Sequence, residues 1–281
     1  MKLDTFEGHV FSAKVDESIV WHKRFGHYNL KSLKLMYDAG MVEDIPEIHV
    51  TAQTCGSCEL RKQHRQSFPK GISKRATHKL ELVHSNIYGP MSTTSLSNNV
   101  YFILFIDDFS RMTWVYFLKT KSQALSMFRN FKSMAETQSG QKIKVLRTDN
   151  GGEYTSKEFN AFHQEVGIVH QLIVPYSSQQ NGVSERKNKT VIEMSRCILF
   201  EKKLRRFLWA EAVNTSVYLL NRLPTKFVQS RTPLEAWSGV RPTAKHLKVF
   251  GSLCYFHVPS AKRGKLDERE SREKNSHWIC S

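Results

Sequence analysis

The chain has 281 residues, 40% of them hydrophobic, which suits one large domain or two smaller ones and excludes disorder throughout. Its 42 Lys and Arg residues outnumber 26 Asp and Glu residues, so the formal net charge is +16 and the pI is near 9.7. A balance this basic favours a polyanionic partner such as nucleic acid.

The cysteines and the apolar segments narrow the class of protein further. Two of the five cysteines form a Cys-x-x-Cys pair, which favours metal or redox chemistry over a disulfide framework. The first twenty residues lack the apolar core of a secretory signal, and no stretch has the roughly 18 apolar residues of a membrane span. We expect a protein of the nucleus or cytoplasm that is not secreted and has no membrane partner.

Residues 1–75 are expected to form a small helical module and a basic linker. Leu30, Leu33 and Met36 recur at the spacing of one helix face, and a run rich in Lys and Arg follows over residues 59–75.

Two pairs of metal-ligating residues lie in this module. His22 and His27 have four residues between them, and Cys55 and Cys58 have two. Four nitrogen and sulfur ligands in two close pairs predict a tetrahedral structural zinc site. The alternatives are a redox pair of cysteines and ordinary surface or core histidines, and two further histidines are spare candidate ligands: His49 and His64.

From Leu80 onward the hydrophobic pattern changes to alternating strands and helices. Apolar runs predict three successive strands, and later segments alternate between the two periods. We expect strands over residues 79–91, 100–107, 113–119, 142–148, 169–175 and 251–259, and helices over residues 122–140, 156–167, 183–203 and 204–224.

This order favours an α/β fold, with a mixed sheet flanked by helices. The expected divisions are the zinc-binding region and linker at 1–75, a core at 76–200, a helical and strand extension of that core at 201–260, and a charged tail at 261–281. The tail is poor in apolar residues and is expected to be disordered.

Acidic residues of the core point to phosphoryl-transfer chemistry. Asp149 ends a predicted strand, and Glu185 begins a long predicted helix 36 positions later, so both carboxylates can reach one end of the sheet. Paired carboxylates are hard oxygen ligands that suit Mg²⁺ or Mn²⁺, and two such ions can activate an attacking oxygen and stabilise a leaving one.

Several motifs in order resemble one known family over residues 20 to 260. The segments HSNIYGP, FIDDFSR, RTDNGGEY and PYSSQQNGVSERKN resemble the integrase core of copia-type (Ty1/copia) retrotransposon Pol polyproteins. WHKRFGH and CGSCELRKQHR resemble the pre-integrase zinc segment of those polyproteins. The resemblance implies an RNase H-like fold, a D,D-35-E triad, 3′-end processing and strand transfer of DNA ends into target DNA, and a homo-oligomer when active.

The first catalytic position departs from the family motif. The motif reads His-Ser-Asp, whereas this chain reads His-Ser-Asn and places a neutral amide at Asn86. An amide lacks the charge that holds two divalent ions, so we expect a large loss of activity. Asp107 and Asp108 are either replacement ligands or caps of the turn that follows their strand.

Further residues beside the two carboxylates are candidate DNA contacts. Glycine permits close approach of a phosphate, and the alternative role of these glycines is a tight turn. Basic residues next to Glu185 suit the DNA backbone, and the alternative for them is a solvated helix face. The candidates are Asn150, Gly151, Gln180, Asn181, Arg186, Lys187 and Lys189.

Three hypotheses follow. The chain is an integrase-type polynucleotidyl transferase weakened at Asn86, or an inactive relic that retains zinc-dependent folding and DNA binding, or a zinc-dependent protein-interaction module. The relic hypothesis draws on Asn86 and on residues 262–281, which leave the family pattern after KRGKLDE. Phosphate contacts weaken steeply with salt, so salt-independent binding would favour the third hypothesis.

Overall fold

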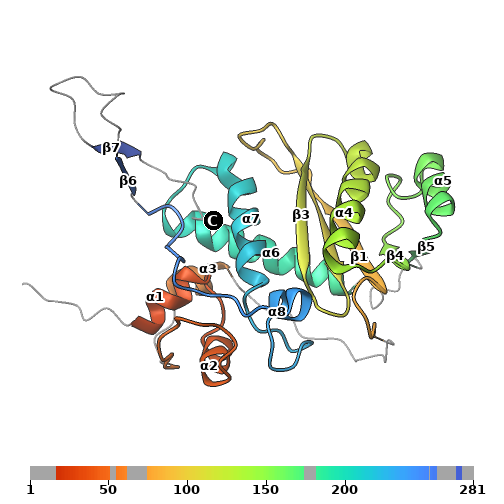
Figure 1. Ribbon diagram of the computed structural model, residues 1–281. Helices are drawn as coiled ribbons and strands as arrows, with labels where there is room; N and C mark the ends of the chain where they lie inside the picture. Colours follow the sequence, from red (N-terminus) through yellow and green to blue (C-terminus); the bar gives the residue numbers. More distant parts are fainter. Residues whose placement is uncertain are drawn as a thin grey trace, which may run out of the picture.

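The computed structural model describes residues 17–50, 55–61, 75–173, 182–252, 254–257 and 270–273, and its centre is a five-stranded sheet (Figure 1). The strands of this sheet are β1 (Leu82–Tyr88), β2 (Tyr101–Asp107), β3 (Thr113–Leu118), β4 (Val145–Thr148) and β5 (Val169–Leu172). The helices are α1 (Glu17–Arg24), α2 (Leu30–Asp38), α3 (Gly56–Arg61), α4 (Ala124–Ser139), α5 (Lys157–Val166), α6 (Gly182–Glu201), α7 (Trp209–Leu220) and α8 (Pro233–Ser238), with short 3-10 turns η1 (Lys121–Gln123) and η2 (Arg206–Leu208). Among the described residues, no helix combines the length and apolarity needed to cross a bilayer.

The strand order is β3-β2-β1-β4-β5. β1, β2 and β3 form an antiparallel meander, whereas β4 runs parallel to β1 and β5 runs parallel to β4. The chain therefore has the RNase H-like mixed sheet flanked by helices that its sequence predicts.

β2 lies inside the sheet and is buried on both faces, which explains its nearly continuous apolar sequence. Successive side chains of a strand point to opposite faces. Phe102, Leu104 and Ile106 pack into one hydrophobic cluster with residues of α6 and α7. Ile103 and Phe105 pack into a second cluster with aromatic residues of α4 and α5. The sheet is therefore the middle layer of three.

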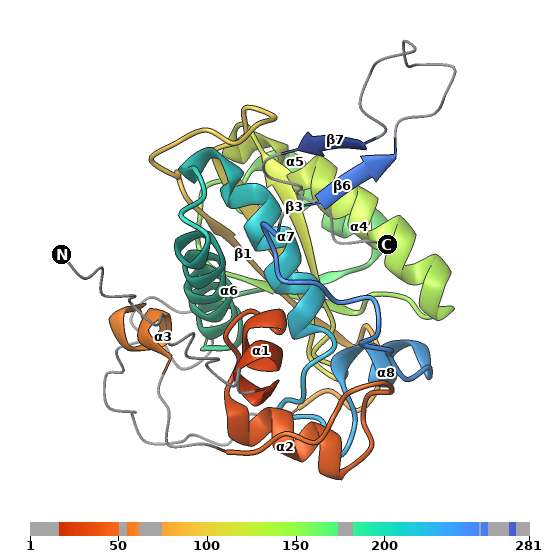
Figure 2. The same ribbon diagram turned by 90° about the vertical axis from the view of Figure 1, so that its left-hand side faces the viewer.

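The N-terminal helices share the core of the α6 and α7 layer. Trp21 and Phe25 at the end of α1 and Leu33 and Met36 of α2 are buried in the same cluster as residues of α6 and α7. Figure 2 shows α1 and α2 below these two helices. The region that carries the four predicted zinc ligands is consequently packed against α6 and α7.

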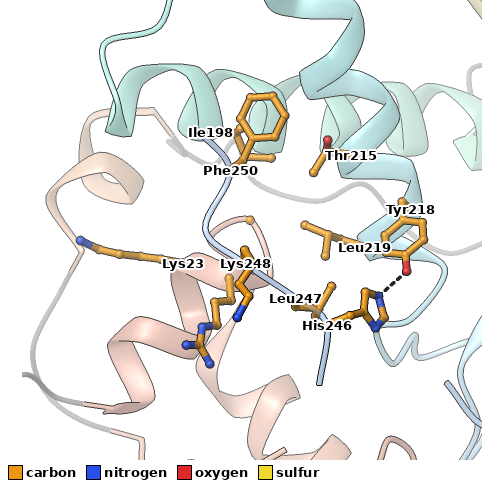
Figure 3. A pocket seen from close by; sticks show the side chains of 11 residues that line it. Lys23, Ile198, Thr215, Tyr218, Leu219, His246, Leu247, Lys248 and Phe250 are labelled. Atoms are coloured by element: carbon orange, nitrogen blue, oxygen red, sulfur yellow. Dashed lines mark hydrogen bonds between the residues drawn. The ribbon is translucent and has the colours of Figure 1, made fainter. Parts of the chain in front are cut away.

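The segment that follows α8 closes the junction between α1, α6 and α7 (Figure 3). Tyr218 and Leu219 of α7 face His246, Leu247 and Phe250, and the Tyr218 hydroxyl is hydrogen-bonded to the His246 ring. The cavity left at this junction is about 20 Å³, which is room for one water molecule. The segment therefore acts as a packed cover.

The C-terminal part differs from the sequence prediction in two places. The helix expected from residue 204 begins at Trp209, after the turn η2. Two short strands, β6 (Cys254–His257) and β7 (Glu270–Glu273), pair antiparallel. β6 lies within the predicted strand 251–259. β7 lies within the tail 261–281 that is expected to be disordered, and the other tail residues lie outside the described residues.

Candidate functional site

Asn86 and Asp149 lie side by side on two parallel strands. β1 and β4 pair with His84 opposite Arg147, and the same register two residues further sets Asn86 beside Asp149. The Nδ2 atom of Asn86 donates a hydrogen bond to Oδ2 of Asp149 at 3.3 Å. The sheet thus brings together the first two positions of the predicted triad.

Asn188 fixes the Asn86 amide from the opposite side. Its Nδ2 atom donates to Oδ1 of Asn86 at 3.2 Å. A carboxylate only accepts hydrogen bonds, so the Asn86 amide must turn its N–H toward Asp149 and its oxygen toward Asn188. Asn188 is not among the residues predicted from the sequence, although it lies three residues after Glu185, on the same helix face, and this spacing indicates a shared site.

Glu185 stands with Asn86 on the wall of one cavity of about 380 Å³, which we name the Asn86 cavity. Glu185 lies in the first turn of α6 and is exposed. Asp149 is joined to the cavity wall by its hydrogen bond to Asn86. The cavity is lined by Asn86, Tyr88, Glu185, Asn188, Lys189, Ile192, Glu193 and Arg196.

The turn after β4 supports the Asp149 carboxylate. Burial raises the pKa of Asp149, and the charge of Glu153 acts in the same direction, while a hydrogen bond from the Gly151 backbone lowers it. That Gly151 N–H donates to Oδ1 of Asp149 at 3.3 Å. The Asn150 side chain donates to the Ile173 carbonyl at 2.9 Å, so it ties this turn to the end of β5.

The basic candidates on α6 divide between two faces. Lys189 lies four residues after Glu185, lines the Asn86 cavity and pairs with Glu193 at 3.8 Å. Lys187 is half-buried away from the cavity lining, and burial together with the charge of Arg111 lowers its pKa to about 8. Arg186 is exposed and is also absent from that lining. Gln180 and Asn181 lie outside the described residues.

Asp107 and Asp108 serve the turn after β2. Asp107 accepts hydrogen bonds from the backbone of Leu80 and from the backbone and hydroxyl of Ser110. Asp108 accepts from His84 and pairs with Arg111, each at 3.0 Å. These contacts agree with the turn-cap interpretation of the two acidic residues.

His22, His27, Cys55 and Cys58 converge at one point, with one ligand atom of each within 4.8 Å of the others. His27 Nδ1 lies 3.2 Å from Cys55 Sγ, and His22 Nε2 lies 3.3 Å from Cys58 Sγ. Nitrogen and sulfur ligands of one tetrahedral zinc ion are about 3.6 Å apart, given the usual metal–ligand bond lengths. The tetrad therefore has the composition and geometry to hold zinc. His49 is not part of it, and His64 lies outside the described residues.

A tight turn after α1 brings the two histidines together. Gly26 has φ +62°, and the backbone N–H groups of Gly26 and His27 donate to the carbonyls of Lys23 and His22. This pair of bonds is the Schellman arrangement that ends a helix with a left-handed residue. A Cβ atom at Gly26 would lie 2.8 Å from Cε of Met194, so glycine suits both the backbone and the packing.

Surrounding groups orient the tetrad. The Tyr28 carbonyl lies 2.6 Å from His22 Nδ1, so that nitrogen carries the proton and Nε2 faces the sulfur atoms as a ligand. Glu201, in the last turn of α6, pairs with Lys23 at 2.7 Å and accepts from the Ser57 hydroxyl at 3.1 Å. Its Oε2 also lies 3.9 Å from His27 Nε2, so α6 ends beside the tetrad.

Two solved structures are similar to this chain. One is the simian T-cell lymphotropic virus intasome in complex with PP2A regulatory subunit B56 gamma, with 21% identity, a TM-score of 0.49, and coverage of 79% of this chain and 76% of that chain. The other is the HTLV-2 integrase catalytic core domain in complex with magnesium (dimeric form), with 20% identity, a TM-score of 0.44, and coverage of 58% and 99%.

Family models and full-length relatives match the sequence directly. Residues 81–178 match the integrase core domain, and residues 2–63 match the GAG-pre-integrase domain. The chain is 41% identical over 264 residues to the retrovirus-related Pol polyprotein from transposon TNT 1-94 of Nicotiana tabacum, covering 94% of this chain and 20% of that polyprotein. It is 32% identical over 253 residues to the polyprotein from transposon RE2 of Arabidopsis thaliana, covering 90% and 17%. The chain thus spans a fifth or less of the length of these relatives.

Proposed function

This chain belongs to the copia-type retrotransposon Pol polyproteins, of which it spans the GAG-pre-integrase domain and the integrase core, and we propose that it binds DNA but catalyses strand transfer poorly. The proposed reactions are metal-dependent 3′-end processing and strand transfer of DNA ends. The observation that carries the proposal is the hydrogen bond from Asn86 to Asp149, because a neutral donor stands where a carboxylate ligand is needed.

The ligand set suits divalent cations only in part. The carboxylates of Asp149 and Glu185 are the hard oxygen ligands that Mg²⁺ and Mn²⁺ prefer. The Asn86 oxygen is engaged by Asn188, and its N–H cannot bind a metal. Bound cations would activate the attacking oxygen and stabilise the leaving one. With one negative charge fewer than three carboxylates, this site holds a pair of dications weakly.

The chain's own groups position that site. The Gly151 N–H orients Asp149, and Asn188 orients the side chain at position 86. Lys189 shares a helix face with Glu185 and so is placed to contact a phosphate at the cavity. The other proposed DNA contacts are Asn150, Gly151, Gln180, Asn181, Arg186 and Lys187.

We assign a structural Zn²⁺ to the tetrad and expect DNA binding to depend on it. The N-terminal helices pack on α6, which carries Glu185, so loss of zinc would disturb the surface beside the catalytic cavity. We propose residues 1–75, 76–200 and 201–260 as zinc-binding, catalytic and extension regions. The proposed partners are element ends and target DNA, and the active form is a homo-oligomer in the nucleus or cytoplasm.

A second candidate function rests on the same amide. An inactive, zinc-dependent nucleic-acid-binding relic is favoured by the two hydrogen bonds that hold Asn86 between Asp149 and Asn188. In that case binding is steeply salt-dependent and transfer is absent.

Strand transfer of a labelled duplex end in Mg²⁺ and in Mn²⁺ separates the two functions, with the end sequence taken from the flanking genomic repeat. The proteins compared are the unmodified chain, Asn86→Asp, and Asn86→Asp with Glu185→Gln. We expect Asn86→Asp to raise the rate on the order of 10²-fold or more, the usual weight of one charge-stabilising group, and the double variant to lose that gain.

Each contrary outcome has a distinct meaning. Robust transfer by the unmodified chain would show that another ligand replaces Asn86. DNA binding without transfer in Asn86→Asp would favour the relic. Binding that does not change with salt would overturn both.

A further inference from the structure

A second cavity adjoins the Asn86 cavity along α6. It has a volume of about 610 Å³ and lies between the loop after β1, the end of α6 and the start of α7. Arg196 lines both cavities, so the two form one path along the helix. We name the second cavity the α6 groove, and its lining includes Thr93, Arg196, Lys203, Arg206 and Trp209.

The α6 groove is strongly cationic. Arg196, Lys203 and Arg206 are exposed, and no Asp or Glu is among the described residues that line the groove. None of the three cations forms an ion pair with a described residue. The nearest acidic residue along the path, Glu193, lies in the Asn86 cavity and pairs with Lys189. Three cations on one concave surface attract a polyanion.

Lys203 occupies a backbone position that usually belongs to glycine. Its φ is +50°, and the N–H groups of Lys203 and Leu204 donate to the carbonyls of Phe200 and Leu199, which ends α6 with a Schellman turn. Glycine adopts this conformation without steric cost, whereas lysine does not. Such conformations concentrate at functional sites. A glycine at position 203 would relieve the backbone strain but would remove the positive charge of the lysine.

The walls of the groove are formed in advance. The Trp209 indole N–H donates to the Thr93 carbonyl at 2.9 Å, which fixes the loop after β1 to the start of α7. Trp209 itself is buried in the core cluster of α6 and α7. A preformed groove needs little ordering when a ligand binds.

The path has the length of a short stretch of DNA. Glu185 and Phe200, at its two ends on α6, are about 22 Å apart at 1.5 Å per residue. B-DNA rises 3.4 Å per base pair, so this distance corresponds to about six pairs.

We propose that the α6 groove binds the phosphodiester backbone of the DNA whose end enters the Asn86 cavity, with Arg196, Lys203 and Arg206 as the phosphate contacts. This inference rests on the proposed DNA-binding function. A second copy of the chain is a poorer occupant, because a two-fold interface sets the same surface against itself and would oppose like charges.

Salt titration of DNA binding tests the groove. Affinity for a labelled duplex longer than the path is measured by fluorescence anisotropy over a range of salt concentrations. The groove variant is Arg196→Gln, Lys203→Gly and Arg206→Gln together. Its matched control is Lys119→Gln, Lys144→Gln and Lys157→Gln, which removes the same charge from exposed residues that line neither cavity.

The groove variant should lose about three units from the slope of log affinity against log salt, since each phosphate contact contributes about 0.9. At low salt its affinity should fall on the order of tenfold or more. The control should keep the slope. Arg196→Lys, Lys203→Arg and Arg206→Lys together keep the charge and should keep the slope as well, which separates charge from misfolding.

Two results would overturn the proposal. Equal slopes for the groove variant and the control, with steep salt dependence in the unmodified chain, would reject the groove and leave DNA binding intact. A changed sedimentation coefficient in the groove variant, with the DNA slope unaltered, would make the groove an interface between copies. Flat salt dependence in the unmodified chain would reject the proposed function itself.

Discussion

The two ends of α6 carry polar sites of opposite character. In its first two turns, Glu185 and Asn188 stand beside Asn86, where the expected acidic set contains a neutral amide. At its last turn, Glu201 stands beside a tetrad in which all four predicted ligands converge. The tetrad has all four of its predicted ligands, whereas the acidic set at the start of α6 lacks one carboxylate.

The difference lies in how each site is assembled. The tetrad depends on one local turn and two short sequence pairs, which bring the histidine nitrogens within 3.2–3.3 Å of the cysteine sulfurs. The Asn86 cavity depends on the pairing of β1 with β4 and on α6, which is distant in the sequence. The neutral Asn86 amide donates a hydrogen bond to Asp149 at the position where the family motif has a charged carboxylate. On the proposed function, zinc binding at one end of α6 is therefore independent of the charge missing at the other.

The largest expected effect is loss of zinc. Cys58→Ser should abolish stoichiometric zinc binding and lower the unfolding temperature by about 10 °C, because metal binding to such a site is coupled to folding. Zinc content by atomic absorption and a thermal melt measure the two effects. The control is Cys197→Ala, which alters a buried cysteine outside the tetrad. Unchanged zinc content in Cys58→Ser would contradict the assignment.

The turn between the histidines gives a smaller effect at the same end of α6. Gly26→Ala should cost about 2 kcal/mol, because a left-handed alanine is strained and its Cβ would crowd Met194 and Leu219. Gly140→Ala is the matched control, since Gly140 also ends a helix with φ +66° but has open space around it, and it should cost about 1 kcal/mol. Urea denaturation with saturating zinc measures both.

Equal costs at the two glycines would show that packing around the tetrad adds nothing. A larger cost at Gly26, accompanied by weaker zinc binding, would tie the histidine turn to the packed end of α6.

The strands and helices of the core could be predicted because they have strong hydrophobic periods, whereas the strand order β3-β2-β1-β4-β5 could not be read from them. The apolar run of β2 and the helical spacing of Phe128 and Phe131 each allow one structure, and both residues are buried where the pattern puts them. The shared core of α1, α2, α6 and α7 could not be predicted in the same way, because the local sequence around Trp21 indicates that this side chain is buried but does not indicate which helices bury it.

Site residues divide along the same line. The convergence of His22, His27, Cys55 and Cys58 could be predicted because the spacing within each pair brings its two side chains close together. Asn188 contacts Asn86 because α6 packs beside β1, and Glu201 lies near His27 because α6 ends there. Neither contact is expressed by a sequence motif. Asp107 and Asp108 show the reverse case, in which acidic residues near the site in sequence belong to a turn.

The last expected effect, which is lost at low pH, concerns that turn and tests whether Asp108 belongs to it or to the Asn86 cavity. Burial alone would raise the pKa of Asp108, but the hydrogen bond from His84 and the charge of Arg111 lower it to about 2. A folded-state pKa below the unfolded value of 3.8 means that Asp108 stabilises the fold above about pH 4. This contribution, about 2 kcal/mol, is lost as the pH falls toward 2.

Asp108→Asn should therefore lower the free energy of unfolding by about 2 kcal/mol at pH 7 and make little difference near pH 2, where the native carboxyl is also neutral. Urea denaturation across this range measures the change, and Asp38→Asn, at an exposed pair with Lys34, should have almost no effect. If Asp108→Asn instead left stability unaltered and weakened Mn²⁺ binding in the protein that retains Asn86, Asp108 would be a metal ligand. Asp108 would then supply the charge that the Asn86 amide lacks, and each end of α6 would have a full set of metal ligands.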